Sequence, residues 1–248
     1  MIASGTGMAV LLAAGCASAN AGPPTARTVA KAPTARPAAS SPAPGASPAP
    51  SPSKAPIPRF WARVSGPLTA HDVPHSWRPG CPVPPRKLRA IRMPYIGFDH
   101  AAHKGELIVN ASVVKKVIKV FARLYRARFP IRRMKPVDAY HGSDPESMAA
   151  DNTSGFNCRR AVAPGPPQWS MHAYGLAIDV NTVQNPYVEA GAPVQPPAGA
   201  AYLNRSDIRP GMAYPGGLLV KAFTAIGWGW GGNWSGSPDY QHFSSSGS

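Results

Sequence analysis

The pattern of apolar and polar positions is clearest between residues 110 and 130, where it predicts a helix. Apolar side chains recur there every three or four positions, and lysines and arginines fall on or near the opposite face. Asn110 or Ser112 can cap the start of this helix, and Pro130 ends it. One apolar stripe with a basic opposite face is typical of a helix packed on a sheet.

Shorter apolar runs predict strands and a second helix. The predicted strands are residues 88–98, interrupted at Pro94, residues 106–109, residues 131–140, with Pro136 at an edge or bulge, and residues 176–178. Residues 216–226 predict a short helix that Gly227 closes. Together these elements predict an α+β fold, a single domain with a small, mainly antiparallel sheet and flanking helices.

Irregular segments separate these elements. Residues 141–157 are polar and rich in glycine, serine and aspartate, which predicts a loop. Residues 181–215 form a long proline-rich insert, and we hypothesise that it makes one wall of a substrate cleft. The tryptophans and glycines of residues 227–234 favour core packing for Trp228 and Trp230, with a substrate shelf as the alternative.

The N-terminal residues differ from the rest in composition. Residues 1–21 predict a signal peptide, because their apolar core is too short to span a bilayer. Leu12-Ala-Ala-Gly-Cys16 resembles a bacterial lipobox, which predicts export and attachment to the membrane only through a lipid on Cys16. Free secretion to the cell envelope is the alternative. Residues 22–58, dominated by proline and alanine, predict a disordered tether. Residues 59–248 are the predicted folded domain.

A histidine and an aspartate stand seven positions apart in Ser170-Met-His-Ala-Tyr-Gly-Leu-Ala-Ile-Asp179. Asp179 ends an apolar run, where a carboxylate is costly unless something compensates its charge. A divalent metal shared with His172 would do so, and hydrogen bonds from backbone N–H groups are the alternative. On an unbroken strand this spacing puts the two side chains on opposite faces, so we expect a bend at Gly175.

A second pair of such residues, Asp239 and His242, lies near the C-terminus. His172, Asp179 and His242 would make a three-ligand zinc site whose fourth position stays open for water. The remaining carboxylate, Asp239, could serve as the base that acts on this water.

The two motifs, Ser170-x-His172-x-x-Gly175-x-Ala177-x-Asp179 and Asp239-x-x-His242, resemble those of the D-alanyl-D-alanine carboxypeptidases and L-alanyl-D-glutamate endopeptidases. These zinc peptidases cut the stem peptides of peptidoglycan, and vancomycin-resistance dipeptidases and phage endolysins belong with them. The resemblance covers roughly residues 77–244. Its first motif is the more specific, because six spaced positions match.

The resemblance implies a role for each matched residue. His172, Asp179 and His242 would bind Zn²⁺, and Asp239 would be the catalytic carboxylate. Many relatives carry Glu at that position, whereas the endolysin-like branch carries Asp.

The family also uses an arginine to stabilise the oxyanion, and Arg159 is the best candidate by its place upstream of His172. Relatives often present this arginine in a Tyr-Arg pair that is missing from this chain. Arg160 and His141 therefore compete for the role.

The activity implied by the resemblance is that of a monomeric zinc-dependent peptidase acting on peptidoglycan stem peptides. D-alanyl-D-alanine carboxypeptidase activity is the first expectation, and L-alanyl-D-glutamate endopeptidase activity is the second. A non-catalytic, zinc-containing module that binds the cell wall is the rival from another class. Asp239 argues against this rival, because an inert domain needs no extra acid beside the metal.

Cys81 and Cys158 remain as a pair once Cys16 is assigned to the leader. In an exported protein they predict a disulfide, which stabilises by about 2–4 kcal/mol. Metal ligation is the weaker alternative, because neither cysteine has a second cysteine or histidine at ligand spacing.

The chain has 26 basic and 11 acidic residues, a formal net charge of +15. Four of the basic residues and none of the acids precede residue 59, so the domain keeps about +11. This charge favours anionic partners. Nucleic acid is discounted, because the charges are scattered and no nucleic-acid-binding motif is present. Anionic wall polymers, phospholipid and the carboxylates of stem peptides remain.

Overall fold

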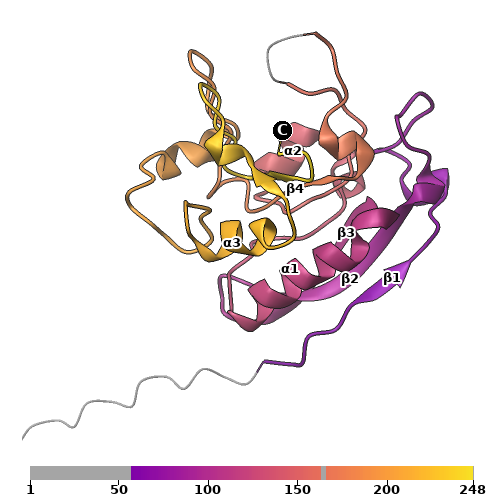
Figure 1. The fold of residues 1–248 in the computed structure, drawn as a ribbon, viewed down its shortest axis with the longest axis horizontal. Helices are drawn as coiled ribbons and strands as arrows, with labels where there is room; N and C mark the ends of the chain where they lie inside the picture. The colour runs from indigo at the N-terminus through magenta and orange to yellow at the C-terminus, as the bar shows by residue number, and fades with distance from the viewer. Residues whose placement is uncertain (1–56, 163–165, 248) are drawn as a thin grey trace, which may run out of the picture. The chain divides into compact units, whose positions relative to one another are not determined.

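The structure is a computed structural model that describes residues 57–162 and 166–247. The predicted signal peptide, its Cys16 and nearly all of the predicted tether lie outside these residues. The described residues form a single α+β domain, as predicted, with two three-stranded antiparallel sheets where one was expected (Figure 1). Within those ranges, none of the helices has the length and apolar character needed to cross a bilayer.

The first sheet has the strand order β1-β2-β3. Its strands are β1 (Arg63–Ser65), β2 (Leu88–Ile96) and β3 (Ala102–Asn110). β2 and β3 pair along their whole length. The predicted interruption at Pro94 is wrong. β1 pairs only with residues 90–92, so Pro94 lies where one side of β2 is unpaired and a missing N–H is tolerated.

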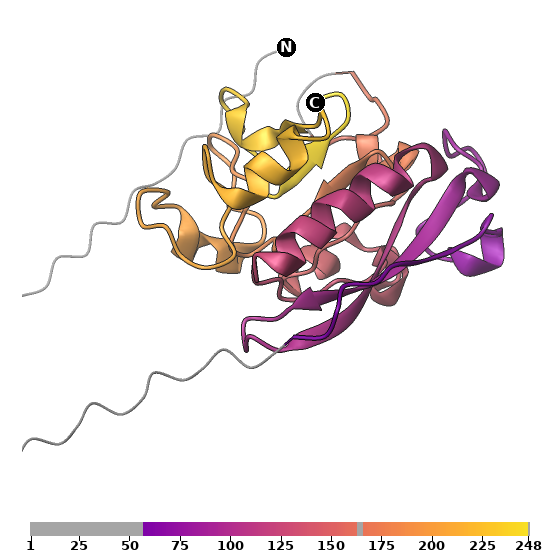
Figure 2. The same ribbon diagram turned by 60° about the horizontal axis from the view of Figure 1, so that its bottom comes forward.

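The predicted helix is confirmed as α1 (Val114–Arg126). A 3₁₀ turn precedes it, and the Asn110 side chain caps this turn by accepting from the Ser112 N–H at 3.1 Å. Phe121 and Leu124 are on its buried face, and its lysines are exposed. Figures 1 and 2 show α1 lying along the first sheet; it contacts β2 and also α3 (Leu218–Thr224).

The predicted strand at residues 131–140 is wrong. This stretch is irregular apart from a 3₁₀ turn at Val137–Tyr140. Pro130 precedes it and Pro136 lies within it, and both lack the N–H groups that a ladder requires. Its backbone hydrogen bonds also go to two different strands, β2 and β3, so no single partner extends the pairing.

The second sheet has the order β4-β6-β5 and consists of much shorter strands. They are β4 (Ala177–Asp179), β5 (Gly229–Trp230) and β6 (His242–Ser244). Phe243 of β6 stacks on Phe223 of α3, with the ring centroids 4.2 Å apart. Trp228 and Trp230 are buried beside them, which confirms their predicted core packing. The predicted strand before Asp179 and the predicted helix α3 are confirmed as well.

A disulfide joins Cys81 to Cys158, as predicted, with a Cα–Cα distance of 5.9 Å. The residues between the two cysteines include β2, β3, α1 and a further short helix, α2 (Asp144–Ala149). Cys158 immediately precedes Arg159, so the covalent link fixes the backbone next to the candidate arginine.

Candidate metal centre

His172 is placed by a short 3₁₀ turn, Met171–Tyr174, that leads into β4. The Ser170 side chain caps this turn and accepts from the His172 N–H at 3.3 Å. Gly175 ends it with φ of 67°, which is the predicted bend. A Cβ at Gly175 would lie 2.6 Å from the Asn110 nitrogen, so the position demands glycine for space as well as for conformation.

Asp179 and His242 lie directly opposite each other in the β4–β6 pair. Directly opposed residues in an antiparallel pair have neighbouring side chains. On the other side of β4, Asp179 and Ser154 exchange two backbone hydrogen bonds of 3.0 Å. Two segments 63 positions apart in sequence are thus brought together by sheet pairing.

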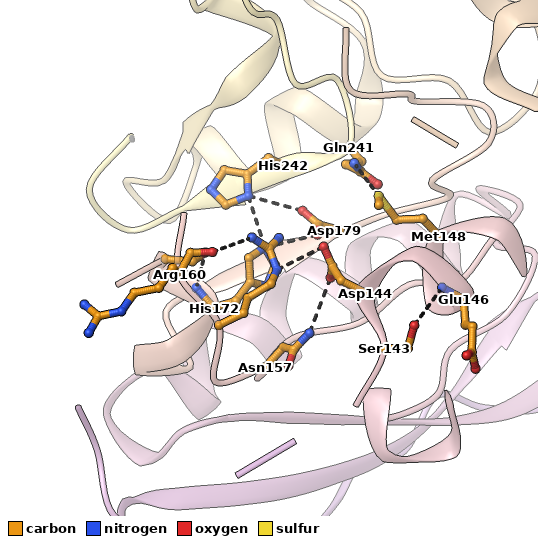
Figure 3. A network of polar contacts seen from close by, with 12 residues as sticks. Ser143, Asp144, Glu146, Met148, Asn157, Arg160, His172, Asp179, Gln241 and His242 are labelled. Carbon is orange, nitrogen blue, oxygen red and sulfur yellow. Dashed lines mark hydrogen bonds and ion pairs between the residues drawn. The ribbon is translucent and has the colours of Figure 1, made fainter. Parts of the chain in front are cut away.

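The side chains of His172, Asp179 and His242 converge and are almost fully buried. His172 Nε2 lies 3.1 Å from His242 Nδ1 and 3.1 Å from an Asp179 oxygen, and His242 Nδ1 lies 3.2 Å from the other Asp179 oxygen (Figure 3). Ligand bonds of about 2.0–2.1 Å in tetrahedral geometry place zinc ligands roughly 3.3 Å apart. The observed separations therefore match one zinc ion shared by the three side chains.

The backbone sets the orientation of the His172 ring. Its Nδ1 is 2.6 Å from the Gly155 carbonyl oxygen, so Nδ1–H donates there and Nε2 keeps its lone pair towards the other two residues. A carbonyl partner of this kind is typical of metal-binding histidines.

The ionisation of Asp179 also suits a ligand. Burial opposes its charge, but the imidazoles of His172 and His242 outweigh burial and lower the pKa of the Asp179 carboxyl. Burial lowers the pKa of His242, while at His172 the charge of Asp179 outweighs burial and raises the imidazole pKa. The carboxylate is therefore ionised, as metal ligation requires.

Asp239 lies beside this cluster and is held by its backbone. Its N–H donates to the Gly231 carbonyl at 3.0 Å, and it forms an antiparallel bridge with Tyr187 of the long insert. A Cβ at Gly231 would lie 2.7 Å from the Asp239 carbonyl oxygen and 3.2 Å from the His242 Cβ, so glycine permits this close packing. Asp239 Oδ1 is buried without a hydrogen-bond partner among the described residues.

Arg159 is the one of the three candidate cations that lines the same cleft as Asp239 and His242. Arg160 is exposed and stacks on Trp169, with its guanidinium carbon 3.8 Å from the ring centroid. His141 is exposed and lies 3.6 Å from Glu146. The geometry thus favours Arg159 over both competitors.

The cleft beside the three converging residues has a volume of about 350 Å³. Its walls combine Arg159 and Asp239 with apolar surface from Trp169, Met171 and Trp234. Among the described residues of the long insert, Tyr187 lines this cleft. A cleft with apolar walls and a few convergent polar groups is typical of a binding site for a small ligand.

The charge around the cluster fits a divalent cation. Three carboxylates, those of Asp144, Asp179 and Asp239, surround the single guanidinium of Arg159. With all three carboxylates ionised and both imidazoles neutral, the formal charge would be −2, and burying such a charge without compensation is costly. Two imidazoles and a carboxylate are also ligands that zinc prefers, so the residues present fit Zn²⁺.

Residues 164–245 match the family model described as D-alanyl-D-alanine carboxypeptidase. The match covers about a third of the chain, and this segment is similar to that family. The match includes His172, Asp179, Asp239 and His242 and supports a carboxypeptidase-type peptidase, as the two motifs predicted. No curated protein and no solved structure matches the chain.

Two residues at the site lie before the carboxypeptidase match and were not predicted. Gly155 orients His172, and Asp144, at the start of α2, pairs with Arg159. Neither has a sequence signal of its own. The helix that carries Asp144 does have one, because Ser143 and Glu146 have capping-box spacing and Ser143 caps α2.

Proposed function

We propose that this protein is a zinc-dependent peptidase that removes terminal D-alanine from peptidoglycan stem peptides. The observation that carries the proposal is the convergence of His172, Asp179 and His242 inside the segment that matches the carboxypeptidase family. Their separations, their burial and the orientation of His172 support zinc as the metal.

His172, Asp179 and His242 would hold the ion, and a zinc site with three protein ligands would keep a fourth position for water. Bound Zn²⁺ would supply Lewis acidity and lower the pKa of a water molecule to about 7.

Asp239 takes the proton from the attacking water and passes it to the leaving amine. Burial, followed by the charge of Asp179, raises the pKa of the Asp239 carboxyl. A raised pKa makes this carboxylate a better proton acceptor near neutral pH than an exposed aspartate. Its partnerless Oδ1 is available for this exchange.

Arg159 donates hydrogen bonds to the oxyanion that forms when the peptide carbonyl is attacked. Its Nη1 donates to the Arg160 carbonyl at 3.3 Å and its Nε faces Asp144, which leaves Nη2 for the substrate. Loss of one such donor typically lowers the rate by about 10²–10³-fold.

The N-terminal residues and the disulfide support a further part of the proposal, that the enzyme works outside the cytoplasm. The lipobox at Cys16 would anchor it, and the tether would let the domain reach the wall. The Cys81–Cys158 disulfide is of the kind that persists in an oxidising compartment.

Incubation of the purified chain with defined muropeptides, with and without a chelator, tests the proposal. Mass spectrometry of the products should show loss of one terminal D-alanine, and chelation should abolish this loss. Cleavage between L-alanine and D-glutamate would instead identify an endopeptidase. Bound zinc with no product would identify a wall-binding module.

Substitution of Asp239 tests the catalytic assignment. Asp239→Ala should keep stoichiometric zinc and lose at least about 10³-fold in kcat, because the proton acceptor is gone while the three ligands remain. Asp207→Ala, which removes an exposed carboxylate elsewhere, is the matched control and should leave kcat unchanged. Hydrolysis retained by Asp239→Ala would refute the role of this residue.

A further inference from the structure

We propose that Asp144, the first residue of α2, is a positioning residue that holds the Arg159 guanidinium in its working orientation at the cleft. The inference rests on the proposed function, because it assumes that Arg159 meets the substrate. It assigns a catalytic contribution to a helix that lies outside the carboxypeptidase match.

The contact between the two side chains is close and mostly shielded from solvent. Arg159 Nε lies 3.0 Å from Asp144 Oδ2, and their side chains are 23% and 19% exposed. Nε has no partner at hydrogen-bond geometry, so the contact is an ion pair rather than an aligned hydrogen bond. The other oxygen, Oδ1, accepts from Asn157 Nδ2 at 3.4 Å (Figure 3). Both Asp144 oxygens are thus directed at the segment that carries Arg159.

The backbone of Arg159 is fixed on both sides, whereas its side chain is long. Its N–H donates to the Asn157 carbonyl at 2.9 Å, and its carbonyl accepts from the Ser170 N–H at 3.1 Å. The disulfide immediately before it adds a covalent restraint. An arginine side chain retains many rotamers on a fixed backbone, so a second contact is needed to select one.

Asp144 is presented by an element that is itself anchored. Ser143 caps α2 by accepting from the Glu146 N–H at 3.3 Å. At the far end of the helix, the Met148 carbonyl accepts from the Thr182 hydroxyl at 2.8 Å. Thr182 follows β4, so α2 is tied to the strand that carries the ligand Asp179. The carboxylate of Asp144 therefore has a fixed position relative to the metal ligands.

Competition between carboxylates explains why the arginine needs this partner. The guanidinium interacts with Asp179 and Asp239 as well as with Asp144. Without Asp144, its nearest charge partners are a metal ligand and the proposed base. A guanidinium drawn onto Asp239 would occupy the proton acceptor and leave the oxyanion without a donor. Asp144 prevents this collapse by holding Nε at 3.0 Å from its own Oδ2.

The substitution Asp144→Asn tests the inference, because it keeps the shape of the side chain and removes its charge. We expect kcat on the D-alanyl-D-alanine substrate to fall about tenfold with KM changed less than twofold, because the arginine acts in the transition state. Zinc content and thermal unfolding should not change. Glu146→Gln is the matched control: it removes a carboxylate from the same helical turn, on a side chain that Figure 3 shows directed away from Asp144, and should leave kcat unchanged.

A double-mutant cycle shows whether Asp144 acts through Arg159. In the Arg159→Ala background, Asp144→Asn should change kcat less than twofold, because the side chain that it positions is gone. An unchanged kcat in the single Asp144→Asn variant, or the same tenfold loss in both backgrounds, would overturn the inference. Absence of turnover in the unmodified protein would contradict the proposed function instead.

A measurement that does not depend on activity completes the test. In ¹⁵N relaxation, the Nε–H of Arg159 should be rigid in the unmodified protein and in Glu146→Gln, and mobile in Asp144→Asn. An equally rigid Arg159 in Asp144→Asn would refute the positioning role whether or not the protein turns over substrate.

Discussion

The two sheets of this domain differ in the length of their strands and in the residues that they carry. In the first sheet, β2 and β3 are nine residues long and pair along their whole length under a thirteen-residue helix. In the second, β4 and β6 have three residues each and β5 has two. The first sheet carries none of the three converging residues, and the second carries Asp179 and His242.

The residues proposed for the chemistry therefore lie in the region with the shorter strands. The first sheet and α1 supply much of the main apolar core, which continues into α3 and into Ile178 and Phe243 of the second sheet; burial of such apolar surface is the main stabilising contribution to folding. The second sheet is held by turns at glycine, by side-chain caps and by stacked aromatic rings. Short strands suit a metal site, because the chain can turn immediately before and after each ligand.

The two regions meet at Gly175. The Asn110 N–H at the end of β3 donates to the Gly175 carbonyl at 2.9 Å, and the Asn110 side chain donates to the Tyr174 carbonyl at 3.0 Å. The turn that places His172 is therefore docked directly on the last residue of the first sheet.

The comparison predicts that loss of a ligand harms chemistry far more than folding. His172→Ala should lose stoichiometric zinc and at least about 10³-fold in turnover, because a catalytic site with two protein ligands binds zinc weakly. Metal analysis and product assays check this. His103→Ala, which changes an exposed position of β3, is the control and should keep both the zinc content and the turnover of the unmodified protein. Full zinc occupancy in His172→Ala would remove His172 from the ligand set.

A substitution in the core beside the first sheet should lower stability and leave turnover nearly unchanged. Phe121→Ala removes a fully buried ring between α1 and the rest of the core, and should lower the free energy of unfolding by about 3–5 kcal/mol. Below the unfolding transition, kcat per folded molecule should stay within about twofold of the unmodified value. Chemical denaturation and active-site titration separate the two quantities. Lys119→Ala, on the exposed face of the same helix, is the control.

A substitution at the junction should affect both regions, to a smaller degree. Gly175→Ala adds a Cβ 2.6 Å from the Asn110 nitrogen at φ of 67°, and should cost about 2–4 kcal/mol and weaken zinc binding. Gly216→Ala has a similar φ of 73° with nothing within 4 Å of the added Cβ, and should cost about 1–2 kcal/mol with zinc binding unchanged. Equal effects of the two variants on zinc affinity would show that docking on Asn110 is unimportant.

The sequence predicted the first sheet and α1 well because these elements are long enough to show a periodic pattern of apolar residues. The apolar spacing of α1 and the cap at Asn110 could be read directly from the sequence. The strand predicted at residues 131–140 failed because Pro130 before it and Pro136 within it outweigh its apolar composition. In the irregular region the ligands were predicted from motif spacing and not from periodicity. Their convergence agrees with that prediction, and their roles remain predictions.

Contacts between segments distant in sequence were beyond what the sequence could reveal. Gly155 supports His172 through a backbone carbonyl, which any residue type could supply. Asp144 meets Arg159 only because α2 folds back beside it, and a polar stretch gives no sign of that. The capping residues of α2 could have predicted the helix itself, but not that it lies beside Arg159.

The disulfide has a topological consequence for the two regions. It encloses nearly all of the first sheet and α1 in one covalent loop, while the three converging residues lie after Cys158. A protease that nicks the chain once between residues 82 and 157 produces two fragments that remain linked through sulfur. A single nick between residues 159 and 171 instead leaves His172, Asp179 and His242 on a fragment with no covalent bond to the other. A first cleavage in the scaffold therefore leaves the molecule covalently whole, whereas one between residues 159 and 171 does not.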